Sequence, residues 1–104
     1  MIKERLCADV LQELFDAKKT GALFVSVKAK SENLIRFYFK DGEIIYLNYG
    51  PISNRECLDM LDCYDLDKAV FLNGHKAPGT ASNLPSTVTI ITVFRKNVKK
   101  VLMD

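Results

Sequence analysis

Two apolar-rich segments flank the dipeptide Asp41-Gly42, and this arrangement constrains the fold more than any other feature of the sequence. In the first segment, residues 34–40, apolar and polar side chains alternate, which is the pattern of a strand with one buried face. The second segment, residues 43–49, is apolar through its middle. Asp-Gly accommodates the positive φ angles of a type I′ turn, whose twist matches a tight hairpin. The sequence therefore predicts a central antiparallel hairpin over residues 34–49.

The rest of the chain supplies helices and further strands around this hairpin. Apolar residues recur at spacings of three to four along residues 3–17, which predicts an amphipathic helix. Residues 22–28 and 67–73 are short apolar runs next to turn-forming residues, and we predict strands there. Residues 54–63 follow a Gly-Pro break and are expected to form a short helix.

Residues 86–102 admit two interpretations. β-branched residues are frequent between Val88 and Val93, which favours a strand over 87–94. Apolar residues at helical spacing, the length of the segment and its lysine-rich end favour a helix. We predict a helix over 86–102 and keep the strand as the alternative. The expected fold is therefore α+β (mixed α/β): an N-terminal helix, an antiparallel sheet of about four strands, a short helix and a C-terminal helix, in one domain spanning residues 1–104.

The composition is that of a globular domain. The chain has 104 residues, of which 48% are hydrophobic and 27% charged, and its formal net charge is +2. This balance is typical neither of a disordered chain nor of a dedicated nucleic-acid binder. The first residues do not resemble a signal peptide, and no apolar stretch approaches the ~20 residues of a membrane span, so we expect a cytoplasmic location. Basic residues cluster near the C-terminus, at Arg95, Lys96, Lys99 and Lys100.

The sequence contains no arrangement of residues that indicates catalysis. The single histidine, His75, has no nucleophile or carboxylate placed around it by a recognisable motif. We interpret it as a surface residue of a loop that is rich in Gly, Pro, Ser and Asn. No glycine-rich phosphate-binding motif is present. We therefore expect no enzyme activity, no catalytic residues and no cofactor.

Two groups of potential metal ligands are better explained without a metal. The cysteines lack the CxxC spacing of zinc sites, and we interpret them as free thiols in a reducing compartment. They are Cys7, Cys57 and Cys63. The acidic segment lacks the central glycine and the regular ligand spacing of a calcium loop, and we interpret it as a solvated surface. Its members are Asp59, Asp62, Asp65 and Asp67.

Alternation along the predicted strands places aromatic and basic residues together on one sheet face. If the apolar residues between them point toward the helices, then Phe24, Arg36 and Tyr38 point the other way. Tyr46 or Leu47 joins them, depending on the register of the hairpin. Exposed aromatic residues on a sheet form a candidate contact surface. The alternative is that another helix, such as the C-terminal one, covers this face.

Residues 11–73 resemble PATAN, a bacterial domain family of largely unknown function. The resemblance rests mainly on two motifs, Thr20-Gly21-x-Leu23 and Phe39-x-Asp41-Gly42. The matching segments are residues 19–25, 37–44, 49–50, 56–61 and 70–72. The resemblance implies an α/β module of bacterial signalling that is commonly found beside response-regulator receiver domains. It further implies protein–protein contacts rather than chemistry, and it offers no catalytic motif.

These observations lead to two functional hypotheses. The first is a non-enzymatic adaptor of bacterial signalling or regulation that binds protein partners, with response-regulator-related proteins and a second copy of the chain as candidates. Its predicted partner-binding residues are Phe24, Arg36, Tyr38 and Tyr46. The alternative is binding of a nucleic acid or another anionic surface through the sheet aromatics and the basic C-terminal helix. We favour the adaptor, because the small residues of the RNP1 motif are missing.

Overall fold

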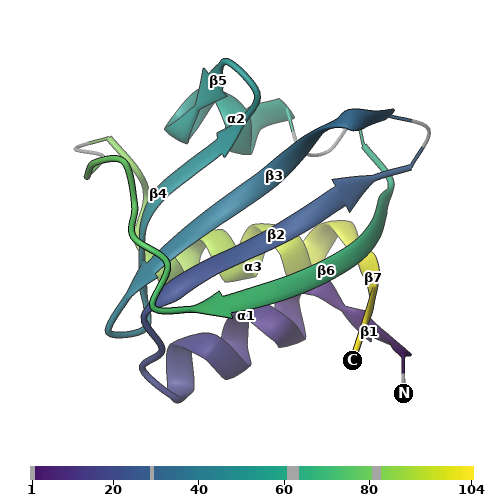
Figure 1. Cartoon of the computed structure of the whole chain (residues 1–104), viewed down its shortest axis with the longest axis horizontal. Coiled ribbons are helices and arrows are strands. Elements are labelled where there is room, and N and C mark those ends of the chain that lie inside the picture. The colour runs from purple at the N-terminus through teal and green to yellow at the C-terminus, as the bar shows by residue number, and fades with distance from the viewer. Residues whose placement is uncertain (1, 29, 61–63, 81–82) are drawn as a thin grey trace.

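A mixed, mostly antiparallel sheet and three helices make up the computed structural model, which describes residues 2–28, 30–60, 64–80 and 83–104 (Figure 1). The strands are β1 (Lys3–Leu6), β2 (Gly21–Val27), β3 (Lys30–Lys40), β4 (Glu43–Tyr49), β5 (Ile52–Ser53), β6 (Leu66–Asn73) and β7 (Lys100–Met103). The helices are α1 (Cys7–Asp16), α2 (Asn54–Met60) and α3 (Thr87–Asn97). The strand order is β1-β7-β6-β2-β3-β4-β5, in which only the β6–β7 pair is parallel. The predicted α+β class is confirmed, and the sheet is larger than the four strands expected.

The predicted central hairpin is confirmed. Lys40 of β3 lies opposite Glu43 of β4, and the two turn residues have positive φ angles, 51° at Asp41 and 88° at Gly42. The tip is tied to the loop after α1 by two hydrogen bonds. The Asp41 N–H donates to Oγ1 of Thr20 at 2.9 Å, and the Gly42 N–H donates to the Lys19 carbonyl at 2.8 Å. These contacts fix the end of the hairpin against the rest of the molecule.

The N-terminal prediction is confirmed for the helix and wrong for its first residues. The segment from Cys7 to Asp16 is helical, and its apolar stripe, including Val10 and Leu11, is buried. Residues 3–6, which we assigned to the helix, form the strand β1 instead. They pair with β7, and Arg5 lies opposite Val101. The hydrogen bonds of this strand come from the other end of the chain, so the helical spacing of nearby residues could not reveal it.

The C-terminal segment is likewise divided between a helix and a strand. Residues 87–97 are helical, so the alternative strand over 87–94 is wrong. The hydroxyl of Ser86 caps α3 by accepting a hydrogen bond from the Thr89 N–H at 3.2 Å. The helix ends at Val98, whose backbone is left-handed with φ of 43°, and β7 follows from Lys100. The predicted helix to residue 102 is therefore too long.

The remaining elements agree with the sequence patterns to within a few residues. β2 and β6 form where strands were expected, and α2 covers the first part of the helix expected over 54–63, of which residues 61–63 lie outside the described part of the chain. α2 begins where the side chain of Asn54 accepts a hydrogen bond from the Leu47 N–H at 3.3 Å. No helix in the described ranges has both the length and the apolar character needed to cross a membrane.

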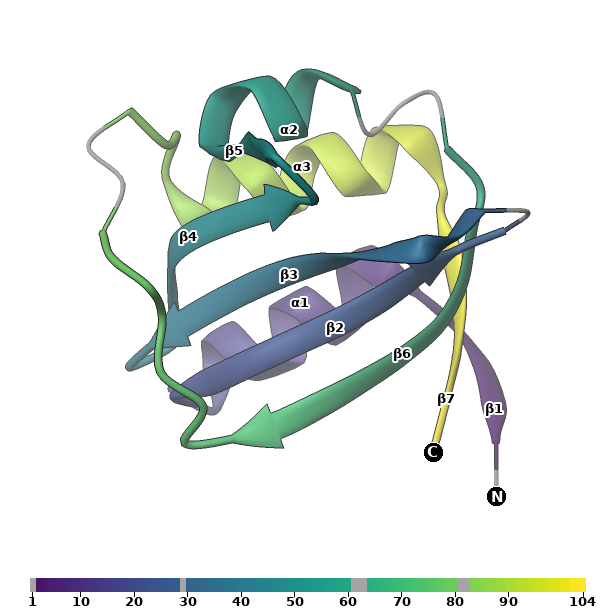
Figure 2. The same ribbon diagram turned by 45° about the horizontal axis from the view of Figure 1, so that its top comes forward.

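All three helices bury apolar residues in one core on the same side of the sheet, and α1 and α3 pack against each other (Figure 2). We call this side of the sheet the inner face. Its largest fully buried side chains are Phe37, Phe39, Leu11, Leu23, Ile35, Leu47 and Ile90. The molecule is compact, with a radius of gyration of 12.3 Å. The opposite side of β2, β3, β4 and β6 is called the outer face below.

Candidate functional site

The outer face carries the residues that the alternation pattern placed together. Tyr38 of β3 lies between Ala22 of β2 and Tyr46 of β4, and Arg36 lies between Phe24 and Asn48. Residues directly opposite one another on neighbouring strands share a face. Phe24, Arg36, Tyr38 and Tyr46 therefore stand on one surface, as predicted, and the register selects Tyr46 rather than Leu47, which is fully buried in the core.

The expected covering helix lies elsewhere. Figure 1 looks onto the outer face, and α1 and α3 both lie behind the sheet. Among the described residues, Ile90, Ile91 and Phe94 of α3 belong to the inner core. The alternative in which the C-terminal helix covers the aromatic residues is thus wrong.

The loop after β6 makes a contact with this face that sequence reasoning missed. The ring of His75 stacks on Tyr38 with centroids 6.1 Å apart and makes a T-shaped contact with Phe24, with centroids 5.4 Å apart. Tyr38 also makes an edge contact with Tyr46 at 6.0 Å. We call Phe24, Tyr38, Tyr46 and His75 the aromatic cluster. Gly74, with φ of 76°, turns the chain at the end of β6 and is the one sequence signal that could have suggested this return.

Exposure differs among the predicted contact residues. Phe24, Arg36 and Tyr46 are half-buried, whereas Tyr38 is 7% exposed. His75 itself is exposed, as expected for a loop residue. Tyr38 lies between Ala22 and Tyr46 and under the imidazole ring, so a partner reaches it only after His75 moves. The expectation that all three of Phe24, Arg36 and Tyr38 are exposed is therefore wrong for Tyr38.

Arg36 supplies the positive charge at the centre of this face. Its guanidinium carbon lies 5.9 Å from the centroid of the Phe24 ring, within the range of a cation–π contact. Arg36 remains half-buried in this contact, so part of its side chain is open to a partner. The aromatic cluster and Arg36 thus combine flat apolar rings with a planar donor, the pair of features that is enriched in protein interfaces.

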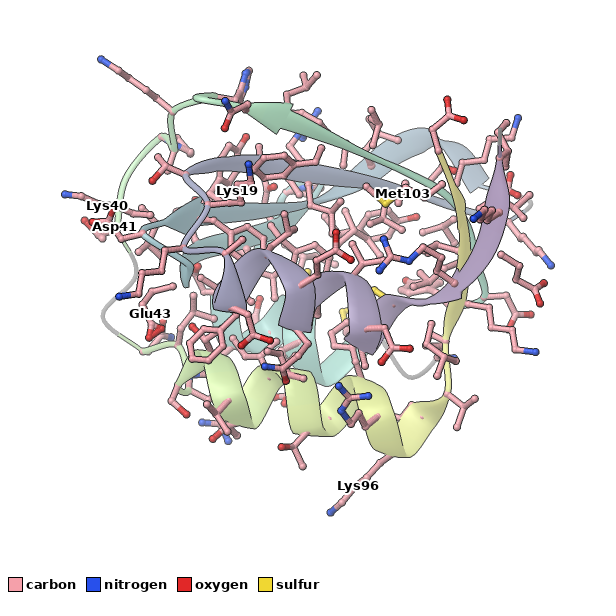
Figure 3. The ribbon with its side chains drawn as sticks, turned by 90° about the horizontal axis from the view of Figure 1, so that it is seen from below. Lys19, Lys40, Asp41, Glu43, Lys96 and Met103 are labelled. Atoms are coloured by element: carbon pink, nitrogen blue, oxygen red, sulfur yellow. The ribbon has the colours of Figure 1, made fainter. Side chains whose placement is uncertain are left out.

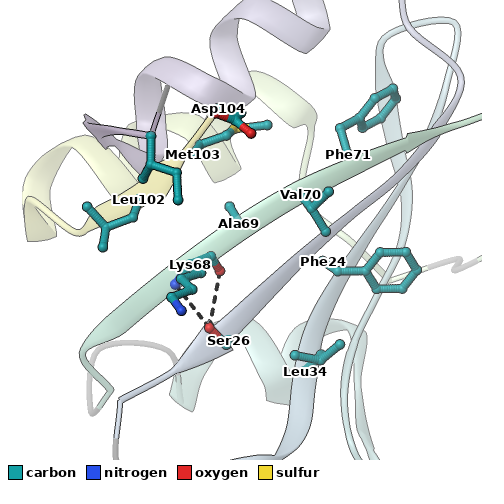
Figure 4. A pocket seen from close by; sticks show the side chains of 11 residues that line it. Phe24, Ser26, Leu34, Lys68, Ala69, Val70, Phe71, Leu102, Met103 and Asp104 are labelled. Carbon is teal, nitrogen blue, oxygen red and sulfur yellow. Dashed lines mark hydrogen bonds between the residues drawn. The ribbon is translucent and has the colours of Figure 1, made fainter.

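A groove of about 560 Å³ adjoins the aromatic cluster (Figure 4). Phe24 and Leu34 line one side, Val70 of β6 lies between, and Leu102 and Met103 of β7 line the other side. Its lining is largely apolar. The Ser26 hydroxyl joins the two strands beside it, because it accepts from the Lys68 N–H at 3.0 Å and donates to the Lys68 carbonyl at 3.3 Å.

The basic residues near the C-terminus lie away from the outer face. Lys96 projects from α3 on the side turned away from the sheet (Figure 3). Arg95 forms an ion pair with Asp9 at 2.8 Å, and Lys100 pairs with Glu4 at 3.6 Å. These side chains therefore do not extend the positive charge of Arg36 into one basic surface.

The candidates for chemistry have structural explanations. Cys7 and Cys57 are free and buried, and burial raises the pKa of each thiol from 9.0 to about 12. A thiol with so high a pKa is a poor nucleophile at neutral pH. Cys63 lies outside the described residues. Asp59 faces Arg55 at 3.8 Å, and within the described ranges no three His, Cys, Asp or Glu side chains converge on a metal site.

Searches with the sequence and the structure found no matching family model, no matching curated protein and no matching solved structure. The resemblance to PATAN over residues 11–73 stays a prediction from the motifs. The function is therefore argued from the geometry of the outer face.

Proposed function

We propose that this chain is a non-enzymatic adaptor that binds a protein partner through the outer face of its sheet. The observation that carries the proposal is the aromatic cluster with Arg36, standing on a sheet face that the helices of the described chain leave uncovered. Aromatic and arginine side chains dominate binding energy at protein interfaces. The PATAN resemblance adds bacterial signalling as the setting, and the location we propose is the cytoplasm, as expected from the sequence.

The chemistry of the face favours a protein over a small molecule or a nucleic acid. The surface is broad and formed by four strands, with a groove at one side. Nucleic-acid binding draws on several cations that reach phosphates together. Here Arg36 stands on the outer face, while Arg95 and Lys96 belong to α3 on the inner side. Lys68, which lines the groove, adds a second cation to Arg36 on this side, but the C-terminal basic residues stay apart from both. Contacts made mainly by apolar rings, with Arg36 and Lys68 beside them, fit a protein partner better than a row of phosphates.

Within this proposal the residues have different roles. Phe24 and Tyr46 offer half-buried rings that a partner covers, and Arg36 donates hydrogen bonds to a carboxylate or carbonyl of that partner. Tyr38 supports its neighbours from beneath His75 and acts as a positioning residue. The loop at His75 then forms one wall of the contact surface.

Site-specific photocrosslinking in the source cells tests the proposal. Tyr46 is replaced by the photoreactive analogue p-benzoylphenylalanine, and Val88, which is 58% exposed on α3, receives the same analogue as the control. We expect a discrete adduct from position 46 that protease removes and nuclease leaves intact, and none from position 88. Adding Arg36→Ala to the position-46 probe should reduce the adduct at least severalfold.

Three results would count against this proposal. An adduct that nuclease removes would mean that the face binds nucleic acid. Equal adducts from positions 46 and 88 would mean that the outer face is not the contact surface. The absence of any adduct at position 46, with the protein folded and expressed, would refute a protein partner on this face.

A further inference from the structure

The strand β6 has one side without a partner strand over most of its length. On its other side it pairs with β2 from Leu66 to Asn73. Its pairing with β7 is limited to Lys68 opposite Leu102, after which the two strands diverge (Figures 1 and 2). Within the described residues, no strand lies beside β6 from Val70 to Asn73 on this side.

The hydrogen-bonding groups on this open edge can be assigned from the ladder. The Gly74 N–H donates to the Thr20 carbonyl at 2.8 Å. In an antiparallel ladder every second residue directs its N–H and C=O groups to the same neighbouring strand, so Leu72 and Val70 also direct theirs toward β2. The intervening residues, Phe71 and Asn73, therefore point their N–H and C=O groups outward. An edge of this kind is a template for another strand.

The open edge also lacks the features that prevent strand pairing. Residues 69–74 are Ala-Val-Phe-Leu-Asn-Gly, with neither a charge nor a proline. On the outer face, Val70 is 53% exposed and Leu72 is 45% exposed. Natural edge strands are usually protected by lysine, proline, a bulge or a covering loop. The exposed valine and leucine therefore indicate that this edge is covered in the working form of the protein.

We propose that a second copy of the chain covers it, by antiparallel pairing of β6 with β6 about a two-fold axis at Phe71. With this register, Phe71 lies opposite Phe71 of the second copy and exchanges both backbone hydrogen bonds with it. Val70 lies opposite Leu72 of the second copy, and the same contact repeats on the other side of the axis. Each exposed apolar side chain thus meets another, as a two-fold interface requires.

The groove beside β6 fits the same partner. Val70, Phe24 and Leu102 line it, and the exposed side chain of Leu72 stands two residues further along the strand. Because Val70 lies opposite Leu72 of the second copy, that leucine side chain enters the groove. Each copy therefore offers one projecting leucine and one apolar groove, side by side on the same edge.

Charge favours antiparallel over parallel pairing of the two copies. In a parallel pair in register, Lys68 would meet Lys68 and Asp67 would meet Asp67. In the antiparallel pair about Phe71, the stretch that pairs, residues 70–72, carries no charge. Lys68 stays beside Leu102 of its own β7, so no like charges face each other. Like charges directly opposite in a sheet are unfavourable. The neutral stretch 70–72 can therefore pair with its own copy in the antiparallel direction without bringing like charges together.

The size of the contact predicts a weak dimer. Two short edge strands with their flanking valine, leucine and groove residues bury on the order of 1,000 Å², near the lower limit of specific interfaces. We expect a dissociation constant of tens to hundreds of micromolar.

Pairing at the edge leaves both outer faces on the same side of one continuous sheet, so the dimer presents two aromatic clusters to a partner. The inference does not depend on what that partner is.

Analytical ultracentrifugation over a dilution series from about 10 µM to 1 mM tests the proposal. The wild-type mass should rise from monomer toward dimer across this range. Val70→Lys should stay monomeric throughout, and circular dichroism checks that it is folded. Val88→Lys is the matched control, because Val88 is comparably exposed, at 58%, on α3; it should dimerise like the wild type.

A disulfide test checks the register. In a non-hydrogen-bonded antiparallel pair, opposite Cα atoms lie about 4.5 Å apart, close enough for a disulfide. A mixture of Val70→Cys and Leu72→Cys should therefore crosslink several times faster than either variant alone, with the wild type as the control for native cysteines. If either variant alone crosslinks faster than the mixture of the two, the two-fold axis does not lie at Phe71. A wild type that stays monomeric at 1 mM, or a Val70→Lys variant that dimerises like Val88→Lys, overturns the proposal while leaving the outer-face crosslinking result untouched.

Discussion

Replacing Gly42 with alanine isolates the contact that holds the hairpin tip. A Cβ atom at this position would lie 2.6 Å from the carbonyl oxygen of Phe15 and 3.1 Å from the Cα of Lys18, both backbone atoms that cannot swing away. The φ angle of 88° adds a second penalty, because it lies in the left-handed region. The alanine variant keeps the N–H that donates to Lys19, so the hydrogen bond is not the cause of any loss.

The expected loss combines two contributions. A left-handed backbone costs an alanine about 1–2 kcal/mol. Forcing a methyl group against the fixed Phe15 carbonyl costs a further ~1–3 kcal/mol, as overpacking does elsewhere. We therefore expect Gly42→Ala to reduce the free energy of unfolding by about 2–5 kcal/mol, a large share of the ~5–15 kcal/mol typical of a domain.

Two other glycines separate these contributions. Gly74 has φ of 76° but open space where the methyl group of an alanine would stand, so Gly74→Ala should show the backbone penalty alone, about 1–2 kcal/mol. Gly79 has open space and no left-handed φ, so Gly79→Ala should change stability by no more than about 0.5–1 kcal/mol, in the stabilising direction. Gly79→Ala thus carries neither penalty, Gly74→Ala carries the backbone penalty alone, and Gly42→Ala carries both the backbone and the steric penalty.

Urea unfolding followed by circular dichroism measures all three. At a slope of about 1–3 kcal/mol per molar, the Gly42→Ala loss of about 2–5 kcal/mol moves the midpoint down by roughly 0.7–5 M. The order of midpoints should be Gly79→Ala highest, then Gly74→Ala, then Gly42→Ala. If Gly42→Ala is no less stable than Gly74→Ala, then the close approach to Phe15 does not contribute to stability and the reasoning fails.

Three further predictions concern the interior and the surface. The buried hydroxyl of Thr87 accepts a hydrogen bond from the Ile44 N–H at 2.9 Å, so Thr87→Val should cost about 1–3 kcal/mol and speed hydrogen exchange at Ile44, whereas the exposed control Thr92→Val should do neither. Burial raises the pKa of the Cys7 thiol from 9.0 to about 12, so above pH 9 the thiol ionises in the unfolded chain while it stays protonated in the folded one. The stabilising contribution of the Cys7 side chain is therefore complete below pH 9 and is lost as the pH rises from 9 to 12. The stability advantage of the wild type over Cys7→Ala in urea should therefore narrow across that window, and a constant difference would contradict the assignment. Arg95→Ala breaks an exposed ion pair with Asp9 and should cost less than about 1 kcal/mol at physiological salt; a larger loss would mean that the pair is shielded from solvent.

The sequence by itself determined the features that depend on neighbouring residues. Asp41-Gly42 set the hairpin, because positive φ at both positions is a property of those two residues and of their turn. Alternation with a period of two set which side chains share a face, and it placed Phe24, Arg36 and Tyr46 together on the outer face. The amphipathic stripe of α1 followed from local spacing in the same way.

Tertiary structure decided the features that depend on residues far apart in the chain. Lys3 pairs with Met103, so β1 and β7 exist because the two ends of the chain meet, and neither segment carries a strand pattern of its own. The stacking of His75 on Tyr38 likewise joins residues that no local periodicity connects. The open edge of β6 arises because β7 pairs with it at one position and then diverges. Local patterns report the conformation of a segment and which of its faces is apolar, but the identity of its hydrogen-bonding neighbour is settled by how the whole chain packs, and that neighbour determines which surfaces remain available for binding.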